Sequence, residues 1–566
     1  MLAVIFVVLF AHWPALSTHA YCFDDREYII DNPLVQNPSW TSAKRFLGEV
    51  LTPSSVSGYY QPLTMISLML DRAVSDDIYD LEPFHRTSLM LHIGNVLLVF
   101  ILFWRLWGQP WAAAIVALLF GVHPMTVEAI PWASERKTLL AAFFSLSCLI
   151  LYVRFTRNRG WLTYGGCLGL YVLALMSKPT STPLPVCLLL LDWWPLRRLN
   201  KQCFIEKIPF FLIAILSSIV TVISQARTCA ILMPTEYDAA RIPLVICHNI
   251  IFYLYKIVWP THLTAHYPFP EPLSLASPAV LVGVLGTCVL IGLLLASLSW
   301  TRSLLTGWLY FFVAIFPTMG VIGFTIVIAS DKYAYLPSIG LMLPLVCFLA
   351  WLWRPGSPTR WRSWGKVGIL SLTVLLTASE IRATRHYLRV WKDTETLHMY
   401  MLTYAPNSPH LHNNLGSELA RKSRLEEAVV HYQRTLELNP QHRRTQFNLA
   451  TALWGLKRPD EALPHFRKAV ELEPDHAEAR NNLAVLLHSR GQVDEAAIHL
   501  TEAIRLKPDY VDAHYNRGAV LLRQRQVGPA IREFQQVLRL RPDHKKARRQ
   551  LNNILKQRPS RSTRDA

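Results

Sequence analysis

The chain has 566 residues, 52% of them hydrophobic, and a formal net charge of +18. This length is too great for one ordinary core, and a single soluble domain does not combine such an apolar fraction with such a charge. We therefore expect an apolar membrane domain joined to a polar, charged domain. Apolar runs fill residues 1–381, whereas polar residues dominate after residue 390, so the boundary lies in the basic stretch Arg382–Arg389.

Apolar segments near bilayer length recur through residues 1–381, and eleven of them are predicted to span the membrane. They lie at 1–16, 89–107, 110–124, 138–155, 161–177, 180–195, 208–226, 279–298, 303–326, 334–353 and 366–380. A further run, 243–258, is too short to cross about 30 Å of hydrocarbon at about 1.5 Å per residue. We interpret it as interfacial or re-entrant. Residues 1–20 have the length of a signal peptide, but no Lys or Arg precedes the apolar run, which argues against cleavage.

The charges of the connecting loops predict the orientation of the spans. Under the positive-inside rule, basic loops face the cytoplasm, and the acid-rich loop 17–88 faces the other side. The basic loops carry Arg105, Arg154, Arg157, Arg159, Arg197, Arg198, Lys201, Lys207, Arg302, Arg354, Arg360, Arg362 and Lys366. Eleven spans satisfy these assignments, so an inside N-terminus implies an outside C-terminus, in the periplasm or in the lumen of a eukaryotic endoplasmic reticulum. Nucleic acid is not an expected partner there.

Two adjacent carboxylates, Asp24 and Asp25 in FDDREYIIDNP, follow the first span directly. Ionisable groups next to a bilayer are costly and therefore indicate function by default. Such a pair suits a general base, a cation site, or both, because one carboxylate can stay ionised while its neighbour is tuned. The alternative is the start of a solvated loop.

A second cluster of charge lies in GVHPMTVEAIPWASERKTLLA, a short outer loop between two spans. It contains His123, Glu128, Arg136 and Lys137, and the two cations oppose the positive-inside preference. Cations held on the outside need an anionic partner, and phosphate is the natural one. The alternative is an interfacial anchor whose long side chains reach the lipid headgroups.

Two further lysines mark the outer ends of spans: Lys178 in SKPTSTPLP and Lys332 in DKYAYLPSIG. Each alone is a weak signal. Four outer cations that converge with an acidic pair would make a site for a lipid-linked phosphate. His85 and His92 flank the second span, and we interpret them as satisfied groups of the core or the interface.

The C-terminal part of the chain repeats with a strict period of 34 residues. The phased residues are Pro406, Pro440, Pro474, Pro508 and Pro542, then Asn414, Asn448, Asn482 and Asn516, then Ala428, Ala462, Ala496 and Ala530. Four residues after the phased alanines come Tyr432, Phe466, Leu500 and Phe534. This pattern is the signature of tetratricopeptide repeats, whose stacked helix pairs build a continuous core and a concave groove for a protein or peptide.

These patterns together predict the domain organisation. We expect a membrane domain at 1–381, a connector with a degenerate half-repeat at 382–405, four repeats at 406–542, and a capping helix with a basic tail at 543–566. The nine cysteines show no metal-ligand spacing. Most are expected to be small buried hydrophobes, and a disulfide between Cys22 and Cys229 is the weaker alternative.

Taken together and in this order, the motifs resemble the transmembrane and tetratricopeptide-repeat O-mannosyltransferase family and its bacterial relatives. The resemblance covers nearly the whole chain. It rests on the Asp-Asp pair after the first span, YYQPLT, FHRTSLMLHIGN, HPMTVEAIPWASERKTLLA, SKPTSTPLPVCLLLLDWWPL, WPTHLTAHYPFP, DKYAYLPSIG and the terminal repeats. The family implies an all-α chain, in which a polytopic transmembrane domain of the GT-C glycosyltransferase fold precedes a tetratricopeptide-repeat solenoid.

The resemblance implies transfer of a sugar, mannose by the family name, from a polyprenyl-phosphate carrier to Ser or Thr hydroxyls of extracytoplasmic proteins. The repeats would recruit the acceptor. Carried over by position, Asp24 or Asp25 is the catalytic base, and His123 and Glu128 shape the site. The cations that would bind the carrier phosphate are Arg136, Lys137, Lys178 and Lys332. A metal is not required, because these cations can stabilise the leaving phosphate, although the aspartate pair could also hold a divalent cation.

Three positions depart from the family pattern. Gln61 stands where an Arg is expected in YYQPLT, Thr138 where an Asp is expected, and Lys332 where an Arg is expected. Arg is the better bidentate phosphate ligand, so these changes leave room for a degenerate or re-purposed enzyme. The rival hypotheses are a non-catalytic membrane scaffold for envelope assembly, and a lipid-linked glycan ligase or flippase.

Overall fold

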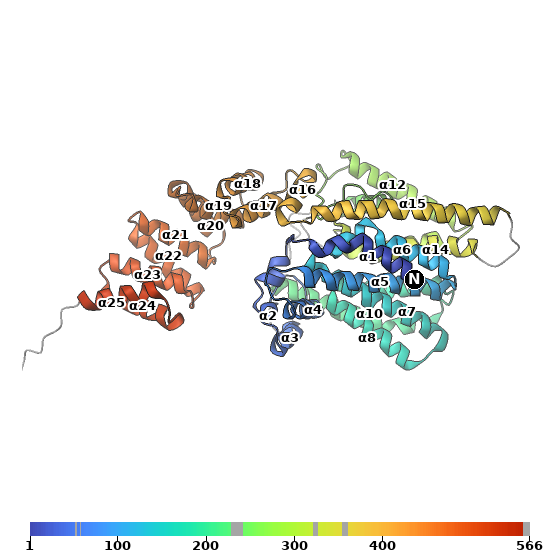
Figure 1. Ribbon diagram of the computed structural model, residues 1–566, viewed down its shortest axis with the longest axis horizontal. Coiled ribbons are helices and arrows are strands. Elements are labelled where there is room, and N and C mark those ends of the chain that lie inside the picture. The colour runs from blue at the N-terminus through green and yellow to red at the C-terminus, as the bar shows by residue number, and fades with distance from the viewer. Residues whose placement is uncertain (51–53, 57, 228–240, 321–326, 354–359, 558–566) are drawn as a thin grey trace, which may run out of the picture. The chain divides into compact units, whose positions relative to one another are not determined.

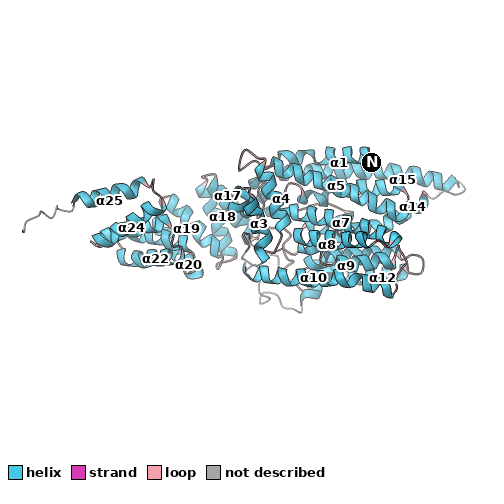
Figure 2. Cartoon of the chain, turned by 90° about the horizontal axis from the view of Figure 1, so that it is seen from below, coloured by secondary structure: helices cyan, strands magenta, loops and turns pink. Residues whose placement is uncertain are grey.

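The computed structural model describes residues 1–566 apart from 51–53, 57, 228–240, 321–326, 354–359 and 558–566 (Figure 1). The regular structure of the described residues is helical (Figure 2). Two isolated β-bridges join His19 to Asp393 and Tyr267 to Ala329. The chain divides into two compact units, Met1–Pro406 and Asn407–Ala566. The predicted all-α fold class is confirmed.

The first unit is built mainly from apolar helices. They are α1 (Leu2–His12), α5 (Glu82–Trp107), α6 (Pro110–Val122), α7 (Arg136–Asn158), α8 (Trp161–Ser177), α9 (Leu184–Trp193), α10 (Lys201–Arg227), α11 (Ile242–Val258), α12 (Pro278–Ser297), α13 (Ser303–Ile315), α14 (Ser338–Leu352) and α15 (Arg360–Val390). Among the described residues, five stretches are long and apolar enough to cross a membrane: Glu82–Trp107, Ala133–Asn158, Lys201–Arg227, Pro278–Ser297 and Trp364–Val390. These stretches mark the first unit as a membrane domain.

Burial separates the inner helices of this unit from the outer ones. The main apolar core takes fully buried side chains from α5 to α8 and from α14, among them Phe103, Phe120, Tyr152 and Tyr171. By contrast, only 22%, 22% and 11% of the most apolar windows of α10, α12 and α15 are buried. In a membrane domain, helices that expose apolar side chains in this way face lipid.

Irregular segments that connect the helices gather at one end of the bundle, which we call the site end. They include the short helices α2 (Pro33–Gln36), α3 (Trp40–Leu47), α4 (Pro62–Ala73), η4 (Pro124–Ala129), η5 (Ala133–Glu135) and η10 (Asp331–Ala334). Side-chain contacts hold these segments together between Asp25 and Ser134, between Glu135 and Lys178, and between Glu128 and Lys332. The predicted site residues therefore all belong to this end.

Helix α11 lies across the site end. The Nε2 atom of His123, directly after α6, lies 2.9 Å from the carbonyl oxygen of Ile257 in the last turn of α11. In the first half of α11, Asn249 Nδ2 donates to the carbonyl oxygen of Ile328, just before η10, at 2.9 Å. Because both halves contact segments of the same end, α11 does not run from one end of the bundle to the other.

Two glycines allow a close crossing of α13 and α14. A Cβ atom built on Gly340 would lie 2.5 Å from the carbonyl oxygen of Gly307 and 2.6 Å from the backbone nitrogen of Phe311. Small residues let membrane helices approach in this way, because their packing does not rely on side-chain volume.

We expect Gly340→Ala to lower the free energy of unfolding of the membrane domain by roughly 1–3 kcal/mol, because the atoms it would meet belong to the backbone and cannot rotate away. Thermal unfolding of the detergent-solubilised protein measures the effect. Gly292→Ala in α12 is the control, since a Cβ atom there meets nothing within 4 Å. Equal transitions for the two variants would contradict the close crossing.

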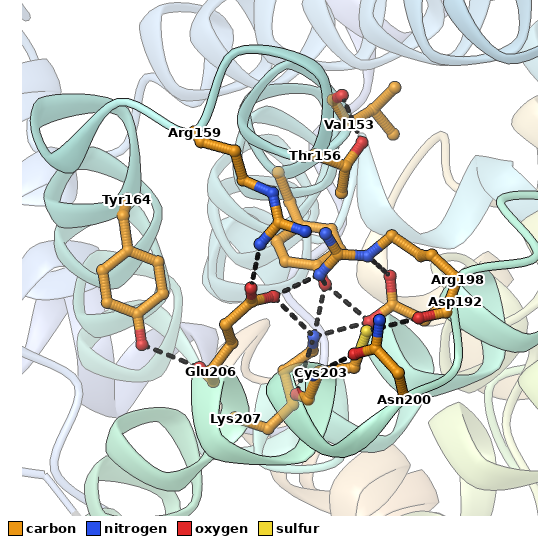
Figure 3. Close-up of polar contacts among 11 residues, drawn as sticks. Val153, Thr156, Arg159, Tyr164, Asp192, Arg198, Asn200, Cys203, Glu206 and Lys207 are labelled. Atoms are coloured by element: carbon orange, nitrogen blue, oxygen red, sulfur yellow. Dashed lines mark hydrogen bonds and ion pairs between the residues drawn. The ribbon is translucent and has the colours of Figure 1, made fainter.

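Figure 3 shows a polar cluster where the other ends of α7, α9 and α10 meet. Asp192 Oδ1 accepts a hydrogen bond from Arg198 Nε at 2.7 Å, and Asp192 Oδ2 accepts from Lys207 Nζ and from the Tyr152 hydroxyl, each at 2.6 Å. Glu206 pairs in turn with Arg198. The side chains of Asp192 and Lys207 are both 0% exposed, so this is a buried ion pair that ties the turn between α9 and α10 to α7.

Asp192→Asn is expected to destabilise the membrane domain by about 3–5 kcal/mol, because it leaves the buried ammonium group of Lys207 without its carboxylate. The control is Asp31→Asn, because the Asp31 side chain is 63% exposed and lies 3.9 Å from Arg26. Its thermal transition should match that of the wild type. If Asp192→Asn also unfolds at the wild-type temperature, the cluster is not a structural tie.

The second unit consists of stacked helix pairs. The pairs are α17 (Pro409–Arg421) with α18 (Leu425–Leu438), α19 (Arg443–Gly455) with α20 (Pro459–Leu472), α21 (Ala477–Ser489) with α22 (Val493–Leu506), and α23 (Val511–Arg523) with α24 (Val527–Leu540), and α25 (Lys545–Gln557) follows. The phased alanines and the larger side chains four residues after them are all buried. Asn448 and Asn516 donate to Asn413 and Asn481 of the preceding repeats, at 3.2 and 2.8 Å. The predicted repeat helices are confirmed.

Several boundaries differ from the sequence prediction. Helix α15 continues to Val390, so Arg382–Arg389 is helical. The side chains of Thr384 and Arg385 donate hydrogen bonds to backbone carbonyl oxygens of neighbouring segments. Helix α16 (Thr394–Tyr404), predicted as a half-repeat, belongs to the first unit. Within the predicted span at 180–195, only the ten residues of α9 form an α-helix. Residues 321–326 of the predicted span 303–326, Arg354 and Cys229 lie outside the described residues.

Candidate active site

Asp24 is the partly exposed carboxylate of the aspartate pair, with 28% of its side chain accessible. Its Oδ1 accepts hydrogen bonds from Trp132 Nε1 at 3.1 Å and from Ser134 Oγ at 2.8 Å, and its Oδ2 accepts one from Lys137 Nζ at 2.8 Å. A carboxylate oxygen has two acceptor positions, so Oδ2 keeps one. Burial raises the pKa of Asp24, but the ammonium groups of Lys137 and Lys332 outweigh burial and hold this pKa below its usual value. Asp24 is therefore ionised at neutral pH.

Asp25 is fully buried and faces the protein backbone. Its Oδ2 accepts a hydrogen bond from the backbone N–H of Cys22 at 2.9 Å, and its Oδ1 accepts one from the backbone N–H of Ser134 at 2.8 Å. Burial and the neighbouring charge of Asp24 raise the pKa of Asp25 to about 7. Asp25 thus ties the segment after α1 to the segment before α7 and offers its oxygens to the backbone.

Three lysines from separate elements converge on one carboxylate, that of Glu135. The Oε1 atom of Glu135 lies 3.3 Å from Lys137 Nζ and 3.1 Å from Lys332 Nζ, and its Oε2 atom lies 3.0 Å from Lys178 Nζ. Because Lys137 also bonds to Asp24, the lysines and Asp24 form one continuous network. The structure therefore brings together four of the predicted site residues: Asp24, Lys137, Lys178 and Lys332.

The surroundings of Lys178 and Lys332 keep their ammonium groups in place. Thr138 Oγ1 accepts a hydrogen bond from Lys178 Nζ at 2.7 Å and donates one to Glu135 at 2.5 Å, so this residue bridges the network at the position where an Asp was expected. The ammonium group of Lys332 lies 3.2 Å from the centroid of the Trp132 ring, a cation–π contact. Burial lowers the pKa of Lys178 to about 8, although the Glu135 carboxylate acts to raise it.

A small pocket lies beside this network. Lys178 and Lys332 contribute charge to its wall, and Thr138, Thr180 and Ser181 contribute hydroxyl groups. The rest of the lining is mostly apolar and comes from Ala141, Ala142, Ala314, Leu336 and Pro337. Such a wall, with a charged part and an apolar part, fits a ligand that joins an anion to a hydrocarbon chain.

Arg136 does not take part in the network, although the sequence assigned it to the carrier phosphate. Its guanidinium pairs with Asp71 at 2.7 Å and donates to Ser88, Ser67 and the carbonyl oxygen of Phe84 at 3.0, 2.8 and 2.5 Å. The side chain is 0% exposed. These partners lie on α4 and α5 or directly beside them, so Arg136 binds the start of α7 to these helices and has no contact with the lysines.

Glu128 and His123 hold neighbouring loops and do not line the lysine pocket. Glu128 Oε2 accepts hydrogen bonds from Ser330 Oγ at 3.0 Å and from the backbone N–H of Lys332 at 2.8 Å, so it fixes the segment that carries Lys332. Burial raises the pKa of Glu128 to about 7, against the effect of Lys332. His123 Nδ1 accepts from the backbone N–H of Met125 at 3.2 Å, while its Nε2 contacts α11 as described above.

The remaining singled-out residues also have partners inside the bundle. His92 lies between the carbonyl oxygen of Gly121, at 2.9 Å, and the hydroxyl of Tyr335, at 2.7 Å. His85 Nδ1 lies 3.3 Å from the Thr18 hydroxyl. Gln61, found where an Arg was expected, is buried and donates to the Tyr28 hydroxyl, whose ring lies 4.9 Å from Lys137 Nζ. Gln61 thus contributes no charge, and its contact with the network is indirect.

The aspartate pair does not fit a divalent cation. Both oxygens of Asp25 accept backbone N–H groups, and Asp24 already holds the ammonium group of Lys137. Hard divalent cations take several oxygen ligands. Across the part of the chain that the structure describes, no group of three His, Cys, Asp or Glu side chains is gathered for one ion. No step of the proposed reaction uses a metal ion.

Family profiles described as tetratricopeptide repeat match residues 407–472, 447–511 and 499–545. Among solved structures, YrrB, described as a TPR protein with an unusual peptide-binding site, is 22% identical, with a TM-score of 0.27, and covers 31% of this chain and 89% of its own.

The chain is also similar to curated proteins named protein O-mannosyl-transferases. F38B6.6 of Caenorhabditis elegans is 25% identical over 452 residues, which are 75% of this chain and 60% of that protein. Tmtc3 of Drosophila melanogaster is 23% identical over 503 residues, which are 74% of this chain and 52% of that protein. The chain thus spans between half and two thirds of the length of these two relatives. In sequence it matches the transmembrane and tetratricopeptide-repeat O-mannosyltransferase family, the resemblance that its motifs indicated.

Proposed function

We propose that this chain is a membrane glycosyltransferase that transfers mannose from a polyprenyl-phosphate carrier to Ser or Thr hydroxyls of extracytoplasmic proteins. The observation that carries the proposal is the network in which Asp24 and three lysines meet at the site end. A carboxylate beside clustered ammonium groups supplies both requirements of glycosyl transfer, a base for the acceptor and positive charge for the leaving phosphate. The names of the relatives, protein O-mannosyl-transferases, support the transfer of mannose to proteins.

The pocket beside the lysines is the proposed place of the donor. Lys178 and Lys332 would pair with the phosphate through charge-assisted hydrogen bonds, which are the stronger kind. Ala141, Ala142 and Leu336 would contact the first isoprene units. The phosphate and the start of its chain would occupy this pocket, and the rest of the carrier would lie in the bilayer beside the bundle.

In the proposed reaction, Asp24 Oδ2 accepts the proton of the acceptor hydroxyl as the hydroxyl oxygen attacks the anomeric carbon. The bond between that carbon and the phosphate oxygen breaks in the same step, so the configuration at the anomeric carbon is inverted. The leaving phosphate keeps the electron pair, and Lys178 and Lys332 stabilise the charge that develops on it. Lys137, bonded to Asp24, favours the ionised form of this carboxylate and so readies it for the next acceptor.

The repeats are proposed to recruit the acceptor polypeptide in their groove, and the site is proposed to face the periplasm, or the lumen of the endoplasmic reticulum in a eukaryote. The positive-inside rule supports this orientation. The ends of α7, α9 and α10 away from the site carry a dense set of basic residues: Arg154, Arg157, Arg159, Arg197, Arg198, Lys201 and Lys207. Those ends would face the cytoplasm.

One assay tests the proposal against its rivals. The purified full-length chain is incubated with a short-chain polyprenyl phosphate carrying radiolabelled mannose, a Ser/Thr-rich peptide and lipid vesicles. We expect label to enter the peptide. Alkaline β-elimination should release that label, because this treatment removes sugars linked to Ser and Thr oxygens. Label in a new lipid product would instead identify a lipid-linked glycan ligase, and label in neither product would favour a non-catalytic scaffold.

A further inference from the structure

Glu135 lies at the centre of the lysine network, although no motif in the sequence predicted a role for it. Its two carboxylate oxygens lie within 3.3 Å of the ammonium groups of Lys137, Lys178 and Lys332, and its Oε2 also accepts a hydrogen bond from Thr138. Its side chain is only 1% exposed. One buried carboxylate therefore contacts all three cations at once.

This arrangement stabilises three like charges in one buried cluster. Three ammonium groups in one buried cluster repel one another, and burial itself disfavours the charged form of each lysine. Without a shared anion, they would move apart or lose protons before any phosphate arrived. The carboxylate of Glu135 offsets both effects, because it attracts all three cations to one point.

We propose that Glu135 is a positioning residue, which gathers the three ammonium groups of the donor-phosphate site and keeps them protonated while the site is empty. The inference rests on the proposed function, since it assigns Glu135 a role toward the donor phosphate. Glu135 acts through the lysines: both of its oxygens are engaged by them and by Thr138, and it does not line the pocket.

Among the three lysines, Lys178 is the one whose pKa lies below its usual value, so its charge depends most on the Glu135 carboxylate. The groups that face it are Glu135 of η5, Lys137 and Thr138 of α7, and Lys332 with the Tyr333 ring of η10. Burial and the two other lysines lower the pKa of Lys178, and Glu135 opposes them, with a pKa of about 8 as the result. Removing the Glu135 charge must lower this pKa further, so Lys178 would lose its proton at a lower pH.

The test is the affinity of the full-length protein for farnesyl phosphate, with farnesol as the uncharged probe, at about pH 6 and about pH 8. At the lower pH, Lys178 is protonated in both proteins, and Glu135→Gln should bind farnesyl phosphate within about threefold of the wild type. At the higher pH, Glu135→Gln should bind at least about tenfold more weakly, because one charged partner of the phosphate is lost. The pKa of Asp25 is also about 7, but Glu135 is not among its causes, so the titration of Asp25 is common to both proteins. The pKa of Glu128 is about 7 as well, and Glu135 is the last of its causes, after burial, Lys332 and Ser330.

The control variant is Glu49→Gln, which alters another buried glutamate of the same unit, bonded to Ser54 and Ser55. It should bind as the wild type does at both pH values. Glu135→Asp keeps the charge on a shorter side chain and should show the same pH-dependent weakening to a smaller extent. If Glu135→Gln does not fold, as judged by its thermal transition, Glu135→Asp carries the test.

The outcomes separate the two proposals. A Glu135→Gln to wild-type affinity ratio that is the same at both pH values would overturn the positioning role, even if both proteins bind the phosphate. So would a Glu135→Asp variant with the wild-type pH dependence. If the wild type does not bind farnesyl phosphate more tightly than farnesol, the proposed donor site itself fails, and the role of Glu135 fails with it.

Discussion

Asp24→Asn is expected to slow mannose transfer by about 10²–10⁴-fold, the usual contribution of a general base, while the protein stays folded. An asparagine cannot take the proton of the acceptor hydroxyl. Its amide oxygen can still accept the hydrogen bonds from Trp132 and Ser134, so the segment after α1 should keep its place. The measurement is the initial rate of label transfer into peptide at saturating donor, together with the thermal transition of each protein.

Asp25→Asn is the matched control for this prediction. Asp25 is buried and accepts two backbone N–H groups, so the NH₂ group of an asparagine would face one of these donors. We therefore expect a lower thermal transition, with a rate per folded molecule that falls far less than in Asp24→Asn. A normal rate for Asp24→Asn and an inactive, folded Asp25→Asn would reverse the assignment.

Lys332→Met is expected to slow transfer by about 10²–10³-fold, because it removes one of the charges that stabilise the leaving phosphate. Lys332→Arg should keep most of the wild-type rate. A guanidinium retains the charge, can stack on the Trp132 ring and is the better bidentate ligand of phosphate. Arg is also the residue that the family pattern places at this position.

The same transfer assay compares these variants with Lys44→Met, which removes an exposed lysine near Trp40 and should leave the rate unchanged. Equal rates for Lys332→Met and Lys332→Arg would mean that the charge at this position plays no part in the reaction. Binding of farnesyl phosphate, measured in parallel, tells whether Lys332 acts on the bound donor or only on the leaving group.

The repeat unit could be predicted almost completely from the sequence. A period of 34 residues repeats every local requirement of the fold, so each repeat supports the prediction for the next. Ala428 and its equivalents must be small where two helices approach, and Pro440 and its equivalents must follow a helix end. These constraints are local, which is why the pattern and the structure agree.

The membrane unit was less predictable, because hydropathy reports composition and not direction. The short run at 243–258 was interpreted as not spanning, in agreement with α11, which lies across one end of the bundle. By contrast, the predicted span at 180–195 holds only the ten-residue helix α9. The basic stretch after residue 381 has the composition of a linker, but Thr384 and Arg385 satisfy backbone carbonyls and let α15 continue. Such endings depend on tertiary partners that a single sequence does not display.

The candidate site was predicted in part. Asp24 and the three lysines could be found, because charge at the ends of apolar segments is conspicuous. Arg136 was assigned by the same reasoning and belongs to the same end, but its side chain does not join the lysines. Adjacent positions at a helix start point in different directions, and the Arg136 guanidinium pairs with Asp71. Glu135 was not predicted, because clustered cations indicate an anionic ligand and do not by themselves reveal which carboxylate neutralises them in the empty site. A carboxylate directly beside Arg136 and Lys137 was the available signal.

In the proposed function, the lysines receive the donor phosphate next to Asp24. The most direct test of this placement is a cryo-electron microscopy structure of the full-length chain in lipid nanodiscs with farnesyl phosphate mannose bound. The proposed mechanism predicts phosphate oxygens within about 3 Å of the ammonium groups of Lys178 and Lys332, with the anomeric carbon on the side of Asp24. A donor bound at another place, with the lysines still closed on Glu135, would contradict it.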